Sequence, residues 1–72
     1  MGKQVEIKKL QKVAAPSEFV GVGVVAFQLV QITINYFGQA MEGVYDTKIM
    51  ADGRQFVIDG DGFIPAGYEL AQ

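Results

Sequence analysis

No charged side chain interrupts the sequence FVGVGVVAFQLVQITINYFGQAM, which covers residues 19–41. No other segment of the chain is apolar enough to seed a core, so the conformation of these 23 residues decides the fold. β-Branched residues are frequent in it, and their restricted χ1 angles suit a pleated strand better than a helix. Gly21 and Gly23 would each cost about 1 kcal/mol relative to alanine inside a helix. We therefore predict that this stretch is extended.

The apolar face of this stretch changes along its length. In residues 30–36 the even-numbered side chains are apolar or aromatic and the odd-numbered ones are polar, as in a strand with one buried face. In residues 25–29 the odd-numbered side chains are the apolar ones, and such a change is typical of a β-bulge or a strand break. A compact domain of this size has a radius of gyration of about 11 Å, too small for one straight strand. We expect two strands, at residues 19–27 and 29–37.

The length of the stretch also fits a membrane-spanning helix, which needs about 20 apolar residues. Its second half, however, carries polar side chains that lipid would leave without partners. These are Gln28, Gln31, Thr33, Asn35 and Gln39. A single-span membrane protein is therefore kept as a third interpretation and is not expected. Whether residues 19–37 form one strand, two strands or a membrane helix stays open at this point.

Composition predicts one small domain, residues 1–72, that needs support from outside its own core. A domain of this size is marginally stable unless a disulfide, a metal or association with other chains supports it. The chain contains no cysteine and no histidine, which excludes disulfides and metal sites built on thiolates or imidazoles. Half of its residues are apolar. We therefore expect a homo-oligomer or a larger protein assembly, and no cofactor.

The N-terminal segment, residues 1–13, is predicted to be a basic arm or an edge strand. Val5 and Ile7 alternate with polar residues, and Leu10 returns to their face only if residues 8–9 form a bulge. A short helix is the alternative. We prefer the strand, because lysines suit an edge that must resist unwanted pairing.

Charge is divided unevenly along the chain. Four lysines against one glutamate give residues 1–12 a net charge of +3, whereas residues 13–72 carry −5. One interpretation is two solvated faces, and the other is a basic arm that docks on the acidic half, within one subunit or across to the next. The arm contains no arginine and no interleaved aromatic residue, so we expect no specific nucleic-acid partner.

Residues 51–54, Ala-Asp-Gly-Arg, give the clearest local signal in the chain. They separate two strand-like runs, residues 43–50 and 55–59, and Gly53 can adopt the positive φ that a tight turn requires. We predict a β-hairpin at this point. The tail that follows is apolar but is interrupted by Pro65 and Gly67, which predicts a closing edge or a segment that binds a partner.

The sequence Asp-Gly-Asp-Gly-Phe-Ile at residues 59–64 resembles the middle of an EF-hand or dockerin calcium loop. In that alignment Val57 stands where the first carboxylate belongs, and Tyr68 stands where the bidentate glutamate belongs. We therefore expect an ordinary Asp/Gly turn and no calcium. Asp59 and Asp61 are the remaining candidates for an acid/base pair, but an acidic turn of this kind is usually just solvated.

The sequence thus predicts an all-β fold, a small antiparallel sandwich or open barrel of four to five strands that neighbouring subunits would complete. With no catalytic motif we expect no enzyme and no catalytic residues. The predicted function is a self-associating structural subunit, as in a viral or phage particle, and the alternative is a small inhibitor or adaptor of a larger host protein. Without a secretory signal we expect synthesis in the cytoplasm. For a viral protein this would be the cytoplasm of the host, before the protein enters the virion. The candidate interaction residues are Lys8, Lys9, Lys12, Phe19, Val22, Val24, Phe27, Phe63 and Tyr68.

Overall fold

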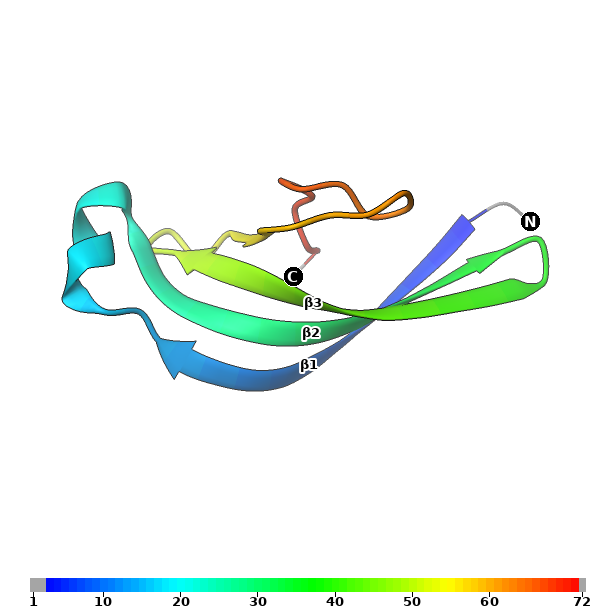
Figure 1. The fold of residues 1–72 in the computed structure, drawn as a ribbon, viewed down its shortest axis with the longest axis horizontal. Coiled ribbons are helices and arrows are strands. Elements are labelled where there is room, and N and C mark those ends of the chain that lie inside the picture. The colour runs from blue at the N-terminus through cyan, green and yellow to red at the C-terminus, as the bar shows by residue number, and fades with distance from the viewer. Residues whose placement is uncertain (1–2, 72) are drawn as a thin grey trace.

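A computed structural model of the protein describes residues 3–71, which form one curved, open antiparallel sheet (Figure 1). The elements follow one another as β1 (Lys3–Ala14), the 3₁₀ helix η1 (Ser17–Val22), β2 (Val24–Tyr36), β3 (Gln39–Met50) and β4 (Gln55–Val57). Neighbours in sequence are also neighbours in the sheet, in the order β1-β2-β3-β4. The prediction of an all-β antiparallel fold is confirmed, with four strands in one sheet.

The uncharged stretch contains one long strand, so the prediction of two strands is wrong. From Val24 to Ile34 the even-numbered side chains of β2 are the buried ones, and Gln28 keeps this alternation where a break was expected. The apolar odd-numbered residues Val25 and Leu29 are exposed on the other face of the sheet. Residues 19–22, which were predicted as strand, belong to η1 instead, and this helix ends at Gly23 with a positive φ of 79°.

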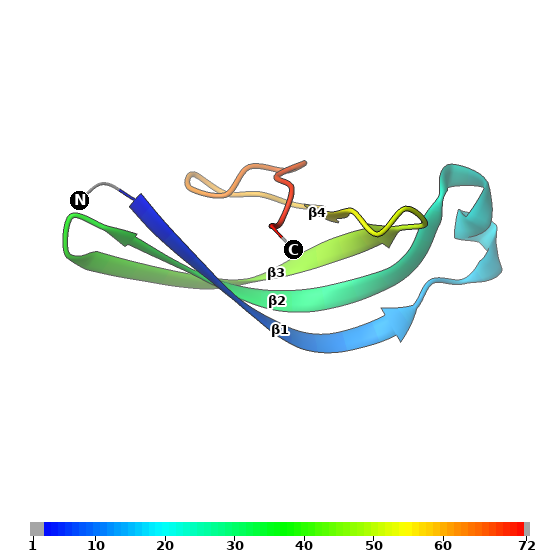
Figure 2. The same ribbon diagram turned by 180° about the vertical axis from the view of Figure 1, so that it is seen from behind.

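Curvature resolves the length problem that led to the prediction of a break. The molecule measures 43 × 20 × 18 Å and has a Cα radius of gyration of 13.1 Å, above the value of about 11 Å for a compact domain of this length. The sheet bends along its long axis, with η1 at one end and the β2–β3 hairpin at the other (Figures 1 and 2).

Residues 24–36 form a strand and not a membrane helix, and residues 3–71 include no helix that is long and apolar enough to cross a membrane.

The C-terminal segment, and not a second sheet, covers the core. Residues 58–71, which we call the C-terminal cover, lie inside the curve of the sheet (Figure 1). We call this side of the sheet the covered face and the opposite side the outer face. On the covered face, side chains from β2, from β4 and from the cover form one buried cluster. Its members are Val30, Ile32, Ile34, Val57, Ile64 and Leu70.

Backbone hydrogen bonds attach the C-terminal cover along β4. The N–H of Val57 donates to the carbonyl of Tyr68 over 2.9 Å, and the N–H of Leu70 donates to the carbonyl of Gln55 over 2.9 Å. The N–H of Gly67 donates in turn to the carbonyl of Val57 over 2.8 Å. The tail therefore returns beside β4, which agrees with the predicted bend at Pro65 and Gly67.

Three polar side chains are buried together on the covered face and explain how Gln28 fits the core. The Nε2 of Gln55 donates to Gln28 Oε1 over 2.9 Å and to Thr47 Oγ1 over 2.8 Å. The Thr47 hydroxyl donates to the carbonyl of Gln28 over 2.8 Å, and Gln28 Nε2 donates to the carbonyl of Leu10 over 3.4 Å. This cluster spans all four strands. Within the described part of the chain no buried side-chain polar atom lacks a partner, as the cost of an unpaired buried group demands.

The strand β1 lies at one edge of the sheet and pairs with β2 along its length. The register shifts between Lys9 and Lys12, so the bulge lies just after the predicted position at residues 8–9. Leu10 remains exposed, because the shift does not return its side chain to the core. Val5 and Ile7 pack at the margin of the buried cluster, as their alternation predicted.

The predicted hairpin at residues 51–54 is confirmed. Gly53 has a φ of 92°, and its N–H donates to the carbonyl of Met50 over 2.9 Å. Arg54 closes the turn and then forms an ion pair with Glu69 of the cover, with 3.2 Å between Nη2 and Oε1. Both side chains of the pair are largely exposed, so we expect it to contribute little to stability.

Candidate interaction surfaces

More large apolar side chains are exposed than are buried in this protein. The described residues bury eight hydrophobic side chains and expose eleven large ones. Single exposed hydrophobic residues are ordinary, but contiguous groups of them mark interaction surfaces. The exposed ones occur on the outer face and at both ends of the sheet. They are Leu10, Val13, Val20, Val22, Val25, Leu29, Tyr36, Phe37, Met41, Val44 and Phe63.

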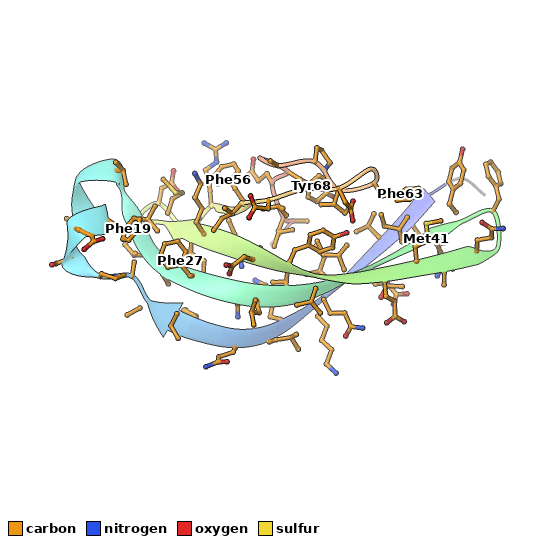
Figure 3. The ribbon with its side chains drawn as sticks, in the orientation of Figure 1. Phe19, Phe27, Met41, Phe56, Phe63 and Tyr68 are labelled. Carbon is orange, nitrogen blue, oxygen red and sulfur yellow. The ribbon has the colours of Figure 1, made fainter. Side chains whose placement is uncertain are left out.

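One group lies where the β2–β3 hairpin extends beyond the C-terminal cover, and we call it the hairpin-end patch: Tyr36, Phe37, Met41 and Phe63. The rings of Tyr36 and Phe37 meet edge to face with centroids 4.5 Å apart. Met41 and Phe63 lie toward the same end of the molecule (Figure 3). A groove of about 220 Å³ opens here between the hairpin and the cover, lined by Ile34 together with Tyr36, Gly62 and Phe63.

Phe37 is held in a backbone conformation that its side chain disfavours. It occupies the first position of the two-residue turn between β2 and β3 with a φ of 49°, and Gly38 follows with a φ of 83°. Two positive φ values are typical of a type I′ hairpin turn, which prefers asparagine or aspartate before glycine. The left-handed conformation costs a residue with a Cβ about 1–2 kcal/mol. The Phe37 side chain is 69% exposed, so burial in the chain itself does not offset this cost.

Asp61 fixes the loop that presents Phe63. Its Oδ1 accepts hydrogen bonds from the N–H groups of Phe63 and Ile64, over 2.8 and 2.9 Å, and its Oδ2 accepts one from the Tyr45 hydroxyl. The Tyr45 ring reaches this position across Gly43, where a Cβ would collide with it. The acidic motif at residues 59–64 is thus a structural turn that joins the cover to β3.

The same hydrogen bonds make the turn sensitive to pH. The backbone N–H of Ile64, the Tyr45 hydroxyl and the N–H of Phe63 lower the pKa of Asp61 below its ordinary value of 3.8, because they favour its charged form. A carboxyl whose pKa is lower in the folded state adds stability above its unfolded pKa and loses it as the pH falls through the folded pKa. The contribution of Asp61 is therefore complete above about pH 4 to 5 and is lost progressively below that range.

We expect Asp61→Asn to reduce the pH dependence of stability below about pH 4. The substitution keeps an oxygen that can accept from residues 63 and 64 but removes the titration. The measurement is the urea midpoint of both chains between neutral and strongly acidic pH, followed by circular dichroism. Asp59→Asn, in the same loop but without a side-chain hydrogen bond among the described residues, is the matched control. Equal pH profiles for the Asp61 variant and the natural chain would contradict the prediction.

A second apolar group lies at the η1 end of the sheet. Phe19 packs edge to face on Phe27, with ring centroids 5.1 Å apart, and both are half-buried (Figure 3). Val20 and Val22 project from η1 into solvent. A shallow hollow of about 290 Å³ lies beside this pair. Its lining residues are Gln11, Val13, Phe27, Gln28, Leu29 and Asp46.

Two stretches of sheet edge have no neighbouring strand within residues 3–71. One is the outer side of β1. The other is part of β3, because β4 pairs only with Thr47–Ile49 and a single further bond joins the Ile58 N–H to the carbonyl of Asp46. Backbone groups of an antiparallel strand alternate between its two sides. The N–H and carbonyl groups of Ala40, Glu42 and Val44 therefore point to the same side of β3 as the carbonyl of Asp46. The described residues provide no hydrogen-bond partner for them.

The two free edges carry opposite charge. Lys8, Lys9 and Lys12 are all exposed on β1, and no described acidic side chain lies within ion-pair distance of them. The free part of β3 carries Glu42, which accepts a hydrogen bond from Gln31 Nε2 over 2.7 Å, and it ends at Asp46. Within the subunit β1 pairs with the uncharged strand β2, and β4 lies at the opposite side of the sheet, so the acidic residues of β3 and of the cover are not the neighbours of β1 in the sheet.

The structure distributes the predicted interaction residues over both ends and one edge. Lys8, Lys9 and Lys12 share the β1 edge, Phe19 and Phe27 contact each other, Val22 is exposed, and Phe63 belongs to the hairpin-end patch. Val24 is only 5% exposed and is a part of the core, and Tyr68 is half-buried against it. Sequence reasoning missed Tyr36, Phe37 and Met41. The Phe-Gly pair at residues 37–38 was the available signal, but phenylalanine is not typical of such a turn.

The chain matches no protein-family model, no curated protein and no solved structure. Within residues 3–71 there is also no group of three or more histidine, cysteine or acidic side chains close enough to hold a metal ion. What the described surface offers is apolar groups and open strand edges, the features by which proteins bind other proteins.

Proposed function

We propose that the protein is a non-enzymatic structural subunit that associates with copies of itself, in an assembly such as a viral or phage particle. The observation that carries this proposal is the excess of exposed over buried large apolar side chains. A 72-residue chain without disulfides is marginally stable on its own, and association would stabilise it by burying these side chains.

The open sheet supports the same proposal. A sheet with unpaired edges is completed most simply by a strand from another chain, which satisfies its free N–H and carbonyl groups. The C-terminal cover does not reach the tip of the β2–β3 hairpin, so the exposed side chains of Tyr36, Phe37 and Met41 are left for contacts between subunits (Figure 1). Strands from neighbouring subunits would thus complete the fold.

The native mass tests the proposal directly. We expect light scattering coupled to size exclusion at micromolar concentration to give a defined multiple of the 7.8 kDa chain mass. Association stabilises by mass action, so the unfolding midpoint is expected to rise with protein concentration. A stable monomer whose midpoint does not depend on concentration would overturn the proposal and leave an adaptor that binds a different protein.

Phe37→Asn is expected to change association without lowering the stability of the fold. Asparagine tolerates a positive φ and forms the preferred type I′ pair with Gly38, so we expect the free energy of unfolding to stay constant or rise by up to about 1 kcal/mol. Removal of the exposed ring is expected to weaken association about tenfold, which corresponds to about 1.4 kcal/mol.

Sedimentation velocity over a range of concentrations measures this effect. Val20→Asn, which removes a similarly exposed side chain at the η1 end, is the matched control for the loss of apolar surface. Unchanged association of the Phe37 variant would show that the hairpin-end patch is not a contact between subunits.

A further inference from the structure

We infer that the outer edge of β1 in one copy pairs with the free edge of β3, residues 40–46, in the next copy. This inference rests on the self-association proposed above and assigns its partner surfaces. The contact is head to tail, because each subunit uses two different edges. Such a contact repeats from copy to copy and produces a ring or a filament rather than a closed pair.

The backbone supports this pairing on both sides. The outer side of β1 has no neighbouring strand, and the N–H and carbonyl groups of Ala40, Glu42 and Val44 have no partner among residues 3–71. Pairing the two edges would satisfy both sets of groups through one ladder. It would also place the contact beside the hairpin-end patch, since Met41 belongs to the same part of β3.

Charge decides which edge meets which. On the outer face, Lys8 of β1 shares its side of the sheet with Glu42 and Asp46 of β3, because each is paired with an odd-numbered residue of β2. On the covered face, Lys9 and Lys12 of one copy would approach a neighbour whose cover carries exposed Asp59 and Asp61. Glu6 is the one acidic residue of β1 and shares the outer face with Lys8, so β1 as a whole presents a positive edge to the negative edge of β3.

The two symmetric alternatives set like charges against each other. Pairing β1 with a second β1 brings together two strands that each carry Lys8, Lys9 and Lys12. Pairing β3 with a second β3 brings together two copies of Glu42 and Asp46. Like charges directly opposite across strands are unfavourable, and lysines on an edge oppose pairing with a like edge. The edge charges thus disfavour the pairing of two like edges and favour the pairing of β1 with β3.

Charge reversal of each edge tests the inference. The acidic-edge variant combines Lys8→Glu with Lys9→Glu, and the basic-edge variant combines Glu42→Lys with Asp46→Lys. We expect each variant alone to associate at least about tenfold more weakly than the natural chain. An equimolar mixture of the two is expected to associate again, because each variant then meets an edge of opposite charge.

A matched control removes the effect of net charge. Glu18→Lys combined with Asp52→Lys gives the same net charge as the basic-edge variant but leaves both edges intact, so we expect it to associate like the natural chain. Circular dichroism confirms that each variant is folded. A second measurement needs no variant: association of the natural chain is expected to weaken as salt rises from about 0.05 M to about 0.5 M.

The outcomes distinguish this inference from the proposal on which it rests. If the natural chain is monomeric, self-association itself fails and the edge pairing fails with it. If the natural chain associates and each edge variant associates equally well alone, self-association stands and the pairing of β1 with β3 is wrong. Stronger association of the natural chain in high salt would likewise overturn the pairing, because apolar contacts would then dominate.

Discussion

Replacing Gly60 with alanine is expected to lower the free energy of unfolding by about 3 kcal/mol or more, because overpacking against fixed backbone cannot be relieved by a rotamer change. A Cβ at this position would overlap backbone atoms of Ile64, Pro65 and Ala66, where the C-terminal cover folds back on itself. The cover would have to open, which would expose the buried cluster of β2. We expect faster proteolytic cleavage in the cover and a lower urea midpoint.

Gly62→Ala is the matched control for this substitution. It adds the same methyl group two residues away, where no atom lies within 4 Å and the backbone does not have a positive φ. We expect its urea midpoint to lie close to that of the natural chain. If the two glycine variants unfold at the same urea concentration, the tight packing of the loop against Gly60 is not a feature of the folded protein.

Ile64→Ala is expected to cost about 2–5 kcal/mol, the range measured for truncation of buried aliphatic side chains. Ile64 is 1% exposed and belongs to the same buried cluster as Ile32 and Ile34 of β2. A domain of this length has only about 4–11 kcal/mol of total stability. The variant would therefore lose a large share of its stability through a single side chain of the cover.

Two further substitutions calibrate this measurement. Ile64→Val removes one methylene group and is expected to cost about 0.5–1.5 kcal/mol. Phe63→Ala changes the exposed neighbour, and we expect its effect on stability to stay within about 0.5 kcal/mol. All chains are compared at one concentration, low enough for the natural chain to be monomeric, since association adds to the apparent stability and Phe63 belongs to the hairpin-end patch. Equal losses for the alanine variants at residues 63 and 64 would contradict the assignment of Ile64 to the core.

Local sequence patterns predicted some of the strands and not others. Alternation identified β1 and the second half of β2, and the Asp-Gly pair identified the hairpin between β3 and β4. Each of these signals depends on residues that are close in sequence, so it can be read without knowledge of the rest of the chain. The same holds for the bend at Pro65 and Gly67, which returns the tail beside β4.

The wrong predictions concern residues whose burial or role depends on tertiary contacts. The buried face of β2 was misassigned near Gln28, because its burial depends on Thr47 and Gln55, which lie 19 and 27 residues away in the chain. The role of Asp61 was equally hidden, since its partner Tyr45 comes from another element. Exposure of Tyr36 and Met41 depends on where the cover ends over the sheet, which no local pattern encodes. Val24 was assigned to the surface, although it is only 5% exposed.

The buried amides of Gln28 and Gln55 have a consequence for folding fidelity. Hydrophobic alternation by itself would tolerate a slip of two residues between β2 and β3, because the same kind of side chain would still point inward. After such a slip, Gln28 would face Tyr45 or Ile49 in place of Thr47, and each orphaned polar group would cost about 1–3 kcal/mol. The hydrogen bonds among Gln28, Thr47 and Gln55 therefore favour the observed register of β2 and β3 over registers shifted by two residues.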